Sequence, residues 1–268
     1  MPEGPECRRF ALALSEHIGG EILAKISILS GRYLKKELSG LKEFQANLPI
    51  QIQGVGVHGK FIYVIFDGKS SMWSSLGMSG AWQKEETPHS RLKFDFKSGK
   101  KVYFNDVRNF GTIKYCQDPK LLASKLESLG PDMLAEEVSN ENFISQMRRN
   151  NDNNITKALM DQSTVAGIGN YVKSEALWLA RINPHKKVSQ LPDNNLKILN
   201  KAIQSIMRES FVSGGVTMRS YKDFFGELGD YSSRFMVYNQ ETDPDGNEVI
   251  KEKTPDGRTT HWVPDIQR

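Results

Sequence analysis

The chain has 268 residues, enough for two domains or for one large domain. Hydrophobic residues make up 38% and charged residues 25%, a composition typical of globular proteins rather than of disordered or fibrous ones. A formal net charge of +4 favours an anionic partner, though only mildly. The sequence lacks an apolar run of the roughly 20 residues that a membrane span needs, and its start lacks the pattern of a signal peptide. We therefore expect an intracellular protein that has no membrane partner.

The first half of the chain reads mainly as strands, preceded by one helix. The helix is expected from about Glu6 to Ile18, ending at Gly19-Gly20. Short runs of β-branched and aromatic residues follow, separated by glycines, across residues 50–80. Residues 91–106 alternate apolar and polar side chains around Ser98-Gly99, which is typical of a hairpin with one buried face.

Three glycines in "GVGVHG" match the spacing of a dinucleotide-binding loop, namely Gly54, Gly56 and Gly59. That loop requires a helix directly after the glycines, whose N-terminus meets the pyrophosphate. Here the strand-like "KFIYVIF" follows, so we reject a nucleotide cofactor. The glycines are expected to form a turn that presents His58 and Lys60, with Lys60 either solvated or in contact with a phosphate.

Helical periodicity begins near "LGPDML" and continues to about Ser213. Asp193 is the expected N-cap of a long helix that Gly214-Gly215 ends, with one apolar face formed by Leu196, Leu199, Ile203 and Ile206. The tail returns to short strands around two Asp-Gly turns, which indicates a compact β-ribbon.

Two further helices are expected within this region, at residues 155–162 and 170–182, joined by "STVAGIG". Gly167 and Gly169 precede the second helix, whose unpaired N–H groups and dipole would favour an anion, with the Asn170 amide as an additional donor. A plain helical hairpin with a glycine turn explains the same residues equally well.

The stretch "NDVRNFG" pairs an arginine with an aromatic side chain, Arg108 and Phe110. Such a pair suits a DNA stack, because the arginine can read a base edge while the ring wedges between base pairs. Met78, in "LGMSG", is another flexible apolar side chain between glycines. Each of these residues alone is more often part of a core or an ordinary surface.

Taken together, these stretches resemble the formamidopyrimidine-DNA glycosylase and endonuclease VIII family of base-excision repair enzymes. The matching motifs occur in the family's order and span nearly the whole chain: "PEGPE" at Pro2–Glu6, "HGK" at His58–Lys60, "LGMSG" at Leu76–Gly80, "NDVRNFG" at Asn105–Gly111 and "DQ…GIGN" from Asp161 to Asn170.

The resemblance implies an α+β protein: an N-terminal β-sandwich domain with its leading helix (1–132), a helix–two-turn–helix domain (133–233) and a β-hairpin finger (234–268). It implies a bifunctional DNA glycosylase and abasic-site lyase that removes oxidised bases and then carries out β,δ-elimination. By the same resemblance, Pro2 is the nucleophile, Glu3 the catalytic acid, Lys60 a phosphate contact beside the lesion and Glu6 a supporting carboxylate.

The implied partner is damaged double-stranded DNA, with single-stranded or bubble DNA as a further substrate, bound by a monomer. The residues expected to contact it are Met78, Arg108, Phe110, Asn170, Arg258 and His89. Among these, the side chains at 78, 108 and 110 would fill the gap left by the flipped nucleotide. A non-catalytic nucleic-acid-binding protein with the same fold is the alternative, although such a protein would not need Pro2 beside Glu3.

The sequence departs from the family pattern in its finger. Many members end in a four-cysteine zinc finger, but both cysteines here, Cys7 and Cys116, lie far upstream. The tail therefore resembles the zincless finger of other members, and neither a metal nor an organic cofactor is expected. Asn109 stands where many members carry a second arginine.

The chemistry gives a reason for an N-terminal proline. At pH 7 a lysine side chain is neutral only ~0.04% of the time, whereas a terminal amine is neutral about 10–15% of the time. We therefore expect Met1 to be removed, because retaining it would turn the Pro2 nitrogen into an amide. As substrates, the family resemblance implies oxidised pyrimidines and ring-opened or further-oxidised purines.

Overall fold

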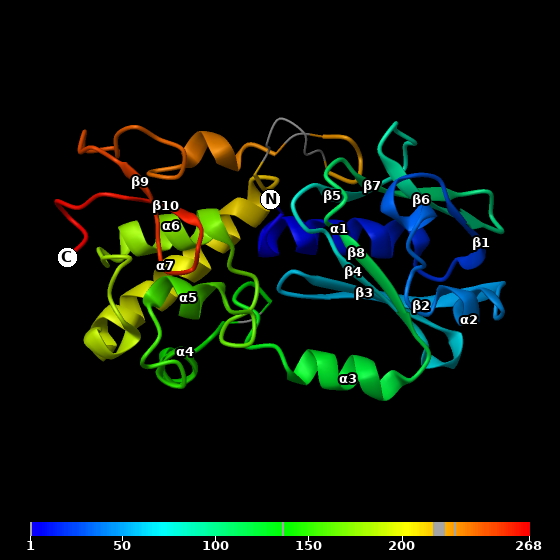
Figure 1. The fold of residues 1–268 in the computed structure, drawn as a ribbon, viewed down its shortest axis with the longest axis horizontal. Coiled ribbons are helices and arrows are strands. Elements are labelled where there is room, and N and C mark those ends of the chain that lie inside the picture. The colour runs from blue at the N-terminus through cyan, green and yellow to red at the C-terminus, as the bar shows by residue number, and fades with distance from the viewer. Residues whose placement is uncertain (1, 136, 217–222, 228) are drawn as a thin grey trace. The chain divides into compact units, whose positions relative to one another are not determined.

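The computed structural model describes residues 2–135, 137–216, 223–227 and 229–268, so Met1 lies outside the described residues. The chain divides into two compact units, which Figure 1 colours along the sequence. The first contains Pro2, Glu6–Glu127 and Gly214–Gly229; the second contains Glu3–Pro5, Ser128–Ser213 and Asp230–Arg268. Among the described helices, none combines the length and the apolar character that crossing a membrane requires.

The first unit is an antiparallel β structure with a leading helix. Its strands follow the order β5-β7-β6-β1-β2-β3-β4-β8. The expected first helix and the expected hairpin are both confirmed, whereas the short helices α2 and α3 were not predicted. The elements are α1 (Gly4–Ile18), β1 (Ile22–Ile28), α2 (Leu41–Gln45), β2 (Ile50–His58), β3 (Phe61–Phe66), β4 (Ser71–Ser75), β5 (Gly80–Gln83), β6 (Ser90–Phe96), β7 (Lys101–Asp106), β8 (Thr112–Cys116) and α3 (Pro119–Glu127).

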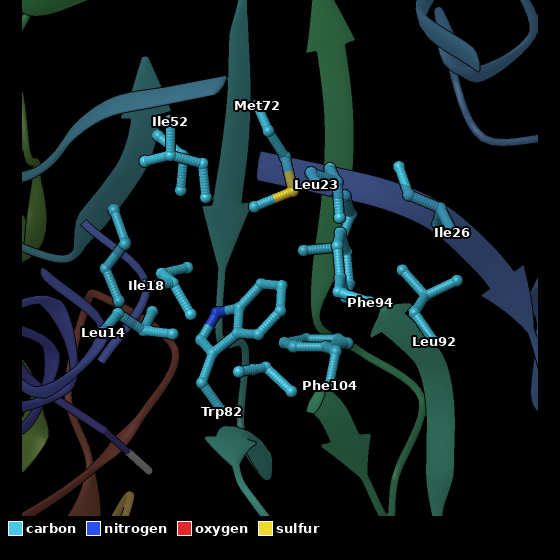
Figure 2. Close-up of a cluster of buried hydrophobic side chains, with 14 of the residues drawn as sticks. Leu14, Ile18, Leu23, Ile26, Ile52, Met72, Trp82, Leu92, Phe94 and Phe104 are labelled. Carbon is cyan, nitrogen blue, oxygen red and sulfur yellow. The ribbon is translucent and has the colours of Figure 1, made fainter. Parts of the chain in front are cut away.

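One apolar core serves both halves of this sheet. The halves β5-β7-β6-β1 and β2-β3-β4-β8 are joined by only two residue pairs between β1 and β2, and both contribute buried side chains to a single cluster. Figure 2 shows this cluster, with Trp82 and Phe104 from one half and Met72 from the other. Leu14 of α1 packs into the same cluster, as expected for an amphipathic helix. This packing makes the unit a β-sandwich with a helix against its core.

The prediction that Gly54, Gly56 and Gly59 together form a turn is wrong for the first two. Gly54 and Gly56 lie inside β2, paired with β3. A Cβ at position 56 would overlap the ring of Tyr63 on the neighbouring strand, so a glycine fits there for steric reasons. Only Gly59, with φ +56, lies in the turn that leads from His58 into β3.

The second unit is helical and ends in a two-stranded ribbon, as predicted. Its helices α6 and α7 lie side by side (Figure 1). The predicted N-cap of α7 is wrong by one residue: Pro192 occupies the cap position and Asp193 is the first helical residue. The Asp193 carboxylate instead pairs with Arg148 at 2.6 Å. The elements are α4 (Asn140–Arg148), α5 (Ile155–Met160), α6 (Asn170–Leu179), α7 (Asp193–Val212), β9 (Ile250–Lys253) and β10 (Thr259–Trp262).

Candidate active site

The N-terminus of α6 holds the carboxylate of Glu3. One carboxylate oxygen accepts the backbone N–H of Tyr171 at 2.9 Å and the other that of Val172 at 3.3 Å. These donors belong to the first turn of α6, where N–H groups lack helical partners and the helix dipole favours an anion. Glu3 is 2% exposed. The anion site expected before Asn170 is therefore occupied by a carboxylate of the chain itself.

Two glycines make this seat possible. A Cβ at Gly169, the N-cap of α6, would overlap the carboxyl group of Glu3. A Cβ at Gly4 would lie 2.6 Å from Cε of Met207, and the Gly4 N–H donates to the carbonyl of Gly167 at 2.8 Å. The close approach of these segments explains the glycines at positions 4 and 169.

The residues on either side of Glu3 are also buried. Pro2 and Pro5 are both enclosed, so this end of the chain differs from a frayed terminus. Glu6 is 1% exposed, and its Oε1 accepts the N–H of Val216 at 2.9 Å. Val216 follows Gly215, whose φ of +83 turns the chain after α7. Glu6 therefore ties the start of α1 to the segment after α7.

The finger (residues 234–268) is hydrogen-bonded to α6 next to the N–H groups that bind the Glu3 carboxylate. Nδ2 of Asn170 donates to the carbonyl of Thr259 at 2.9 Å. Arg258 directly precedes Thr259, and its side chain is exposed in the turn between β9 and β10. The structure thus brings three of the predicted site residues, Glu3, Asn170 and Arg258, to one end of α6.

Several further residues of α6 hold the finger, and no sequence motif had singled them out. Lys173 pairs with Asp256 in the finger turn. The carboxylate of Glu175 accepts the backbone N–H groups of Met236, Val237 and Tyr238 at 2.7–2.9 Å. Burial raises the pKa of Glu175, and these three donors partly offset that rise. A lysine or glutamate on a helix usually faces solvent, so only the folded chain reveals these contacts.

A second group of predicted residues gathers in the first unit, on the loops 76–79 and 107–111. Met78 is 41% exposed and Phe110 is 53% exposed, so both apolar side chains are accessible on the loops. The guanidinium of Arg108 lies 5.0 Å from the centre of the Phe110 ring, within cation–π range. The exposed His89 lies at the base of this group, because its carbonyl accepts the N–H of Asp106 at 3.0 Å.

Lys60 occupies the turn between β2 and β3. The register pairs His58 with Phe61 across that turn, so Lys60 sits at the end of the hairpin, where it is partly exposed. Gly59 supplies the positive φ that this tight connection needs.

The finger residues do not fit a zinc site. Residues 234–268 contain no cysteine, and the only two cysteines of the chain, Cys7 and Cys116, are buried in the first unit. Across the part of the chain that the structure describes, no three His, Cys, Asp or Glu side chains gather as a ligand set. Hydrogen bonds and the Lys173–Asp256 pair hold the turn between β9 and β10.

Family models cover nearly the whole sequence. The formamidopyrimidine-DNA glycosylase N-terminal domain matches residues 1–113, its H2TH domain residues 129–222 and its C-terminal domain residues 227–268. A formamidopyrimidine-DNA glycosylase of Cytobacillus firmus is 33% identical over 279 residues, covering 100% of both chains.

Solved structures agree with this match over the full length. The G226P variant of the Lactococcus lactis enzyme, in complex with DNA containing Fapy-dG, superimposes with a TM-score of 0.87 at 27% identity and covers 100% of both chains. The wild-type L. lactis enzyme with DNA containing an oxidised pyrimidine gives a TM-score of 0.85 at 26% identity, again covering 100% of both chains.

The antiparallel sheet domain, the H2TH helices and the match to glycosylase–DNA complexes together define a DNA-repair glycosylase. The chain belongs to the formamidopyrimidine-DNA glycosylase family.

Proposed function

We propose that this glycosylase is bifunctional, excising an oxidised base and then cleaving the abasic site through a Schiff base on Pro2. The observation that carries the proposal is the fixed position of the buried Glu3 carboxylate at the N-terminus of α6. The residue that directly follows the proposed nucleophile is buried and fixed by two backbone N–H groups of α6. A carboxyl group held so firmly next to an amine is suited to proton transfer at one defined place.

In the proposed reaction, the unprotonated Pro2 nitrogen forms a bond to C1′ of the damaged nucleotide as the base departs with the glycosidic electron pair, and the N–H proton of the attached nitrogen passes to the departing base. Glu3 delivers a proton to the ring oxygen, which opens the sugar and leaves an iminium. Loss of a C2′ proton then expels the 3′ phosphate, and a second elimination expels the 5′ phosphate. Hydrolysis of the remaining iminium releases the sugar fragment as an aldehyde and returns the free amine.

The remaining predicted residues are proposed to bind DNA. Met78, Arg108 and Phe110 would occupy the space of the flipped nucleotide, which offsets an unstacking cost of a few kcal/mol. Lys60, Asn170 and Arg258 would contact phosphates, and His89 would contact the DNA near the void-filling side chains. Five of these side chains are exposed on loops and on the finger turn, and Lys60 and Asn170 are partly exposed, in a hairpin turn and at the start of α6, which supports this role. Phosphate contacts make affinity salt-dependent and independent of sequence.

The proposed substrates are oxidised pyrimidines and ring-opened or further-oxidised purines. Related L. lactis structures contain Fapy-dG or an oxidised pyrimidine, which supports both classes. We propose damaged duplex DNA as the main substrate, single-stranded or bubble DNA as a further one, and a monomer as the active form. The enzyme would act where DNA is repaired, in the nucleus or the cytoplasm.

Borohydride trapping tests the proposal directly. Wild-type protein mixed with a duplex that carries an oxidised pyrimidine should become covalently attached to the DNA on reduction. Pro2→Gly or an N-terminally blocked protein should lose most of this adduct, while Glu3→Gln should lose base excision. A wild-type protein that binds damaged DNA but gives no adduct on any oxidised or abasic substrate would instead be a non-catalytic binder or would use a different mechanism.

A further inference from the structure

The two loops that carry the void-filling side chains lie against each other within the first unit. A Cβ at Gly77, which has φ +60, would lie 2.7 Å from the backbone carbon of Phe110 and 2.8 Å from the nitrogen of Gly111. The loop 76–79 therefore rests directly on the backbone of the loop 107–111. This leaves little room for either loop to move without the other.

One buried carboxylate connects both loops. Asp106, the last residue of β7, is 1% exposed. Its Oδ1 accepts the hydroxyl proton of Ser79 at 2.6 Å, and its Oδ2 accepts the N–H of Gly111 at 2.7 Å. Hydrogen bonds to a charged acceptor are stronger than neutral ones, so this link resists separation of the loops.

Ser79 extends the link to Arg108. Its Oγ accepts the backbone N–H of Arg108 at 2.8 Å while its proton goes to Asp106. An ionised carboxylate can only accept hydrogen bonds. The Ser79 hydroxyl must therefore donate to Asp106 and accept from Arg108. The bonded groups are the backbone N–H of Arg108 itself, the side-chain hydroxyl of Ser79 next to Met78 and the backbone N–H of Gly111 next to Phe110. Each proposed void-filling residue is therefore bonded directly or is one residue from a bond.

Hydrogen bonds from neighbouring residues fix the two ends of the loop 107–111. Arg91 is 8% exposed, and its Nε donates to the carbonyl of Asp106 at 2.8 Å while its Nη1 donates to Oγ of Ser30 at 2.9 Å. Tyr33 donates its hydroxyl to the carbonyl of Gly111 at 2.8 Å, and Arg32 donates to the same carbonyl. Both ends of the loop 107–111 are thus held while its tip is exposed.

We propose that Asp106 and Ser79 are positioning residues that hold the side chains of Met78, Arg108 and Phe110 in one fixed arrangement, so that the three enter the DNA stack as a unit. This inference rests on the proposed void-filling role of those three side chains. A buried aspartate that only ended strand β7 would need hydrogen bonds only within the turn that follows it. Of the two hydrogen bonds to the Asp106 carboxylate described above, one instead comes from Ser79 on the other loop.

Ser79 gives the sharper test, because it is only partly buried and a small change suffices. Single-turnover base excision would be measured on a lesion duplex, with 2-aminopurine beside the orphaned base to report unstacking. Ser79→Ala should slow both the excision rate and the 2-aminopurine unstacking rate about tenfold, which is the effect of losing one coupled hydrogen-bond pair. Ser79→Thr, which keeps the hydroxyl, should restore them to within about twofold. The control is Ser124→Ala, an exposed serine in α3, which should behave as wild type.

A comparison in two backgrounds separates positioning from general stability. In a Met78→Ala/Arg108→Ala/Phe110→Ala background all three void-filling side chains are absent, so adding Ser79→Ala should change excision by less than about twofold. The proposal is overturned if Ser79→Ala matches wild type, or if it costs the same factor in both backgrounds. Failure of the proposed function would look different: Met78→Ala/Arg108→Ala/Phe110→Ala would then excise as fast as wild type, or wild type would form no borohydride adduct.

Discussion

Lys173 of α6 and Asp256 of the finger turn form a buried ion pair, with Nζ 2.6 Å from Oδ2 and the two side chains 0% and 3% exposed. Asp256 also accepts the Thr254 hydroxyl at 2.6 Å and the N–H of Arg258 at 3.4 Å through Oδ1. Burial alone would raise the pKa of Asp256, but the hydrogen bonds from Lys173 and Thr254 hold it below its ordinary value. The pair thus fixes the turn that presents Arg258.

Removing one partner of this pair should destabilise the second unit strongly. Asp256→Asn leaves the Lys173 ammonium buried without its counter-charge, a change that typically costs about 3–5 kcal/mol. The double variant Lys173→Met/Asp256→Leu should recover most of that loss, because well-packed apolar groups can replace a buried pair. Urea denaturation monitored by circular dichroism measures both variants.

Asp245→Asn provides the matched control for that experiment. Asp245 lies in the other Asp-Gly turn of the tail and its side chain is exposed, so its substitution should cost less than about 0.5 kcal/mol. Equal unfolding free energies for Asp245→Asn and Asp256→Asn would contradict a stabilising role for the ion pair.

Because the Glu3 carboxylate lies directly against Gly169, adding a single methyl group at position 169 should have a large effect on base excision. Gly169→Ala would place a methyl group where the Glu3 carboxyl lies, so the carboxyl must leave the N–H groups of Tyr171 and Val172. If Glu3 is the proton donor, base excision should fall at least a hundredfold, the usual contribution of a positioned general acid. Rapid-quench excision assays measure this fall.

Gly54→Ala is the companion variant. Gly54 lies in β2 and needs no positive φ, and a methyl group added there would meet no described atom within 4 Å. Its excision rate should equal that of wild type. A Gly169→Ala protein as active as Gly54→Ala would show that the seat of Glu3 is not required for the reaction.

The sequence predicted the elements of both units well, because strand alternation and helical periodicity report which face of each element is buried. The α1 helix and the hairpin of β6 and β7 are examples. It failed where a residue's partner is distant along the chain. Nothing near Asp106 indicates that it bonds Ser79, which is 27 residues away. Lys173 likewise meets a residue 83 positions later, and no local pattern encodes that distance.

The composition of the finger predicts that chelators leave the protein unaffected. Residues 234–268 lack cysteine, and side-chain contacts to α6 hold the turn. Treatment with 1,10-phenanthroline followed by gel filtration should therefore change neither the melting temperature nor the affinity for abasic-site duplex. Elemental analysis of the untreated protein provides the independent check, and one zinc per chain would refute the zincless assignment.

His261 introduces a pH dependence of stability. Its side chain is 6% exposed and packs edge-on to Tyr238 with ring centres 4.8 Å apart. Burial, with smaller contributions from Lys251 and Lys173, lowers its pKa from 6.5 to about 4. The folded state therefore keeps this imidazole neutral at pH values where the unfolded chain already binds a proton.

The sign follows from that difference in proton binding. Between about pH 6.5 and pH 4 the unfolded state holds more protons at His261, so the free energy of unfolding falls as the pH is lowered. The full shift corresponds to about 3 kcal/mol, and the effect is absent above pH 6.5. His261→Gln cannot titrate, so its stability should fall less steeply over this interval, whereas the exposed His89→Gln should follow wild type. Parallel wild-type and His261→Gln curves in urea titrations from pH 7 to pH 4 would rule out this role for His261.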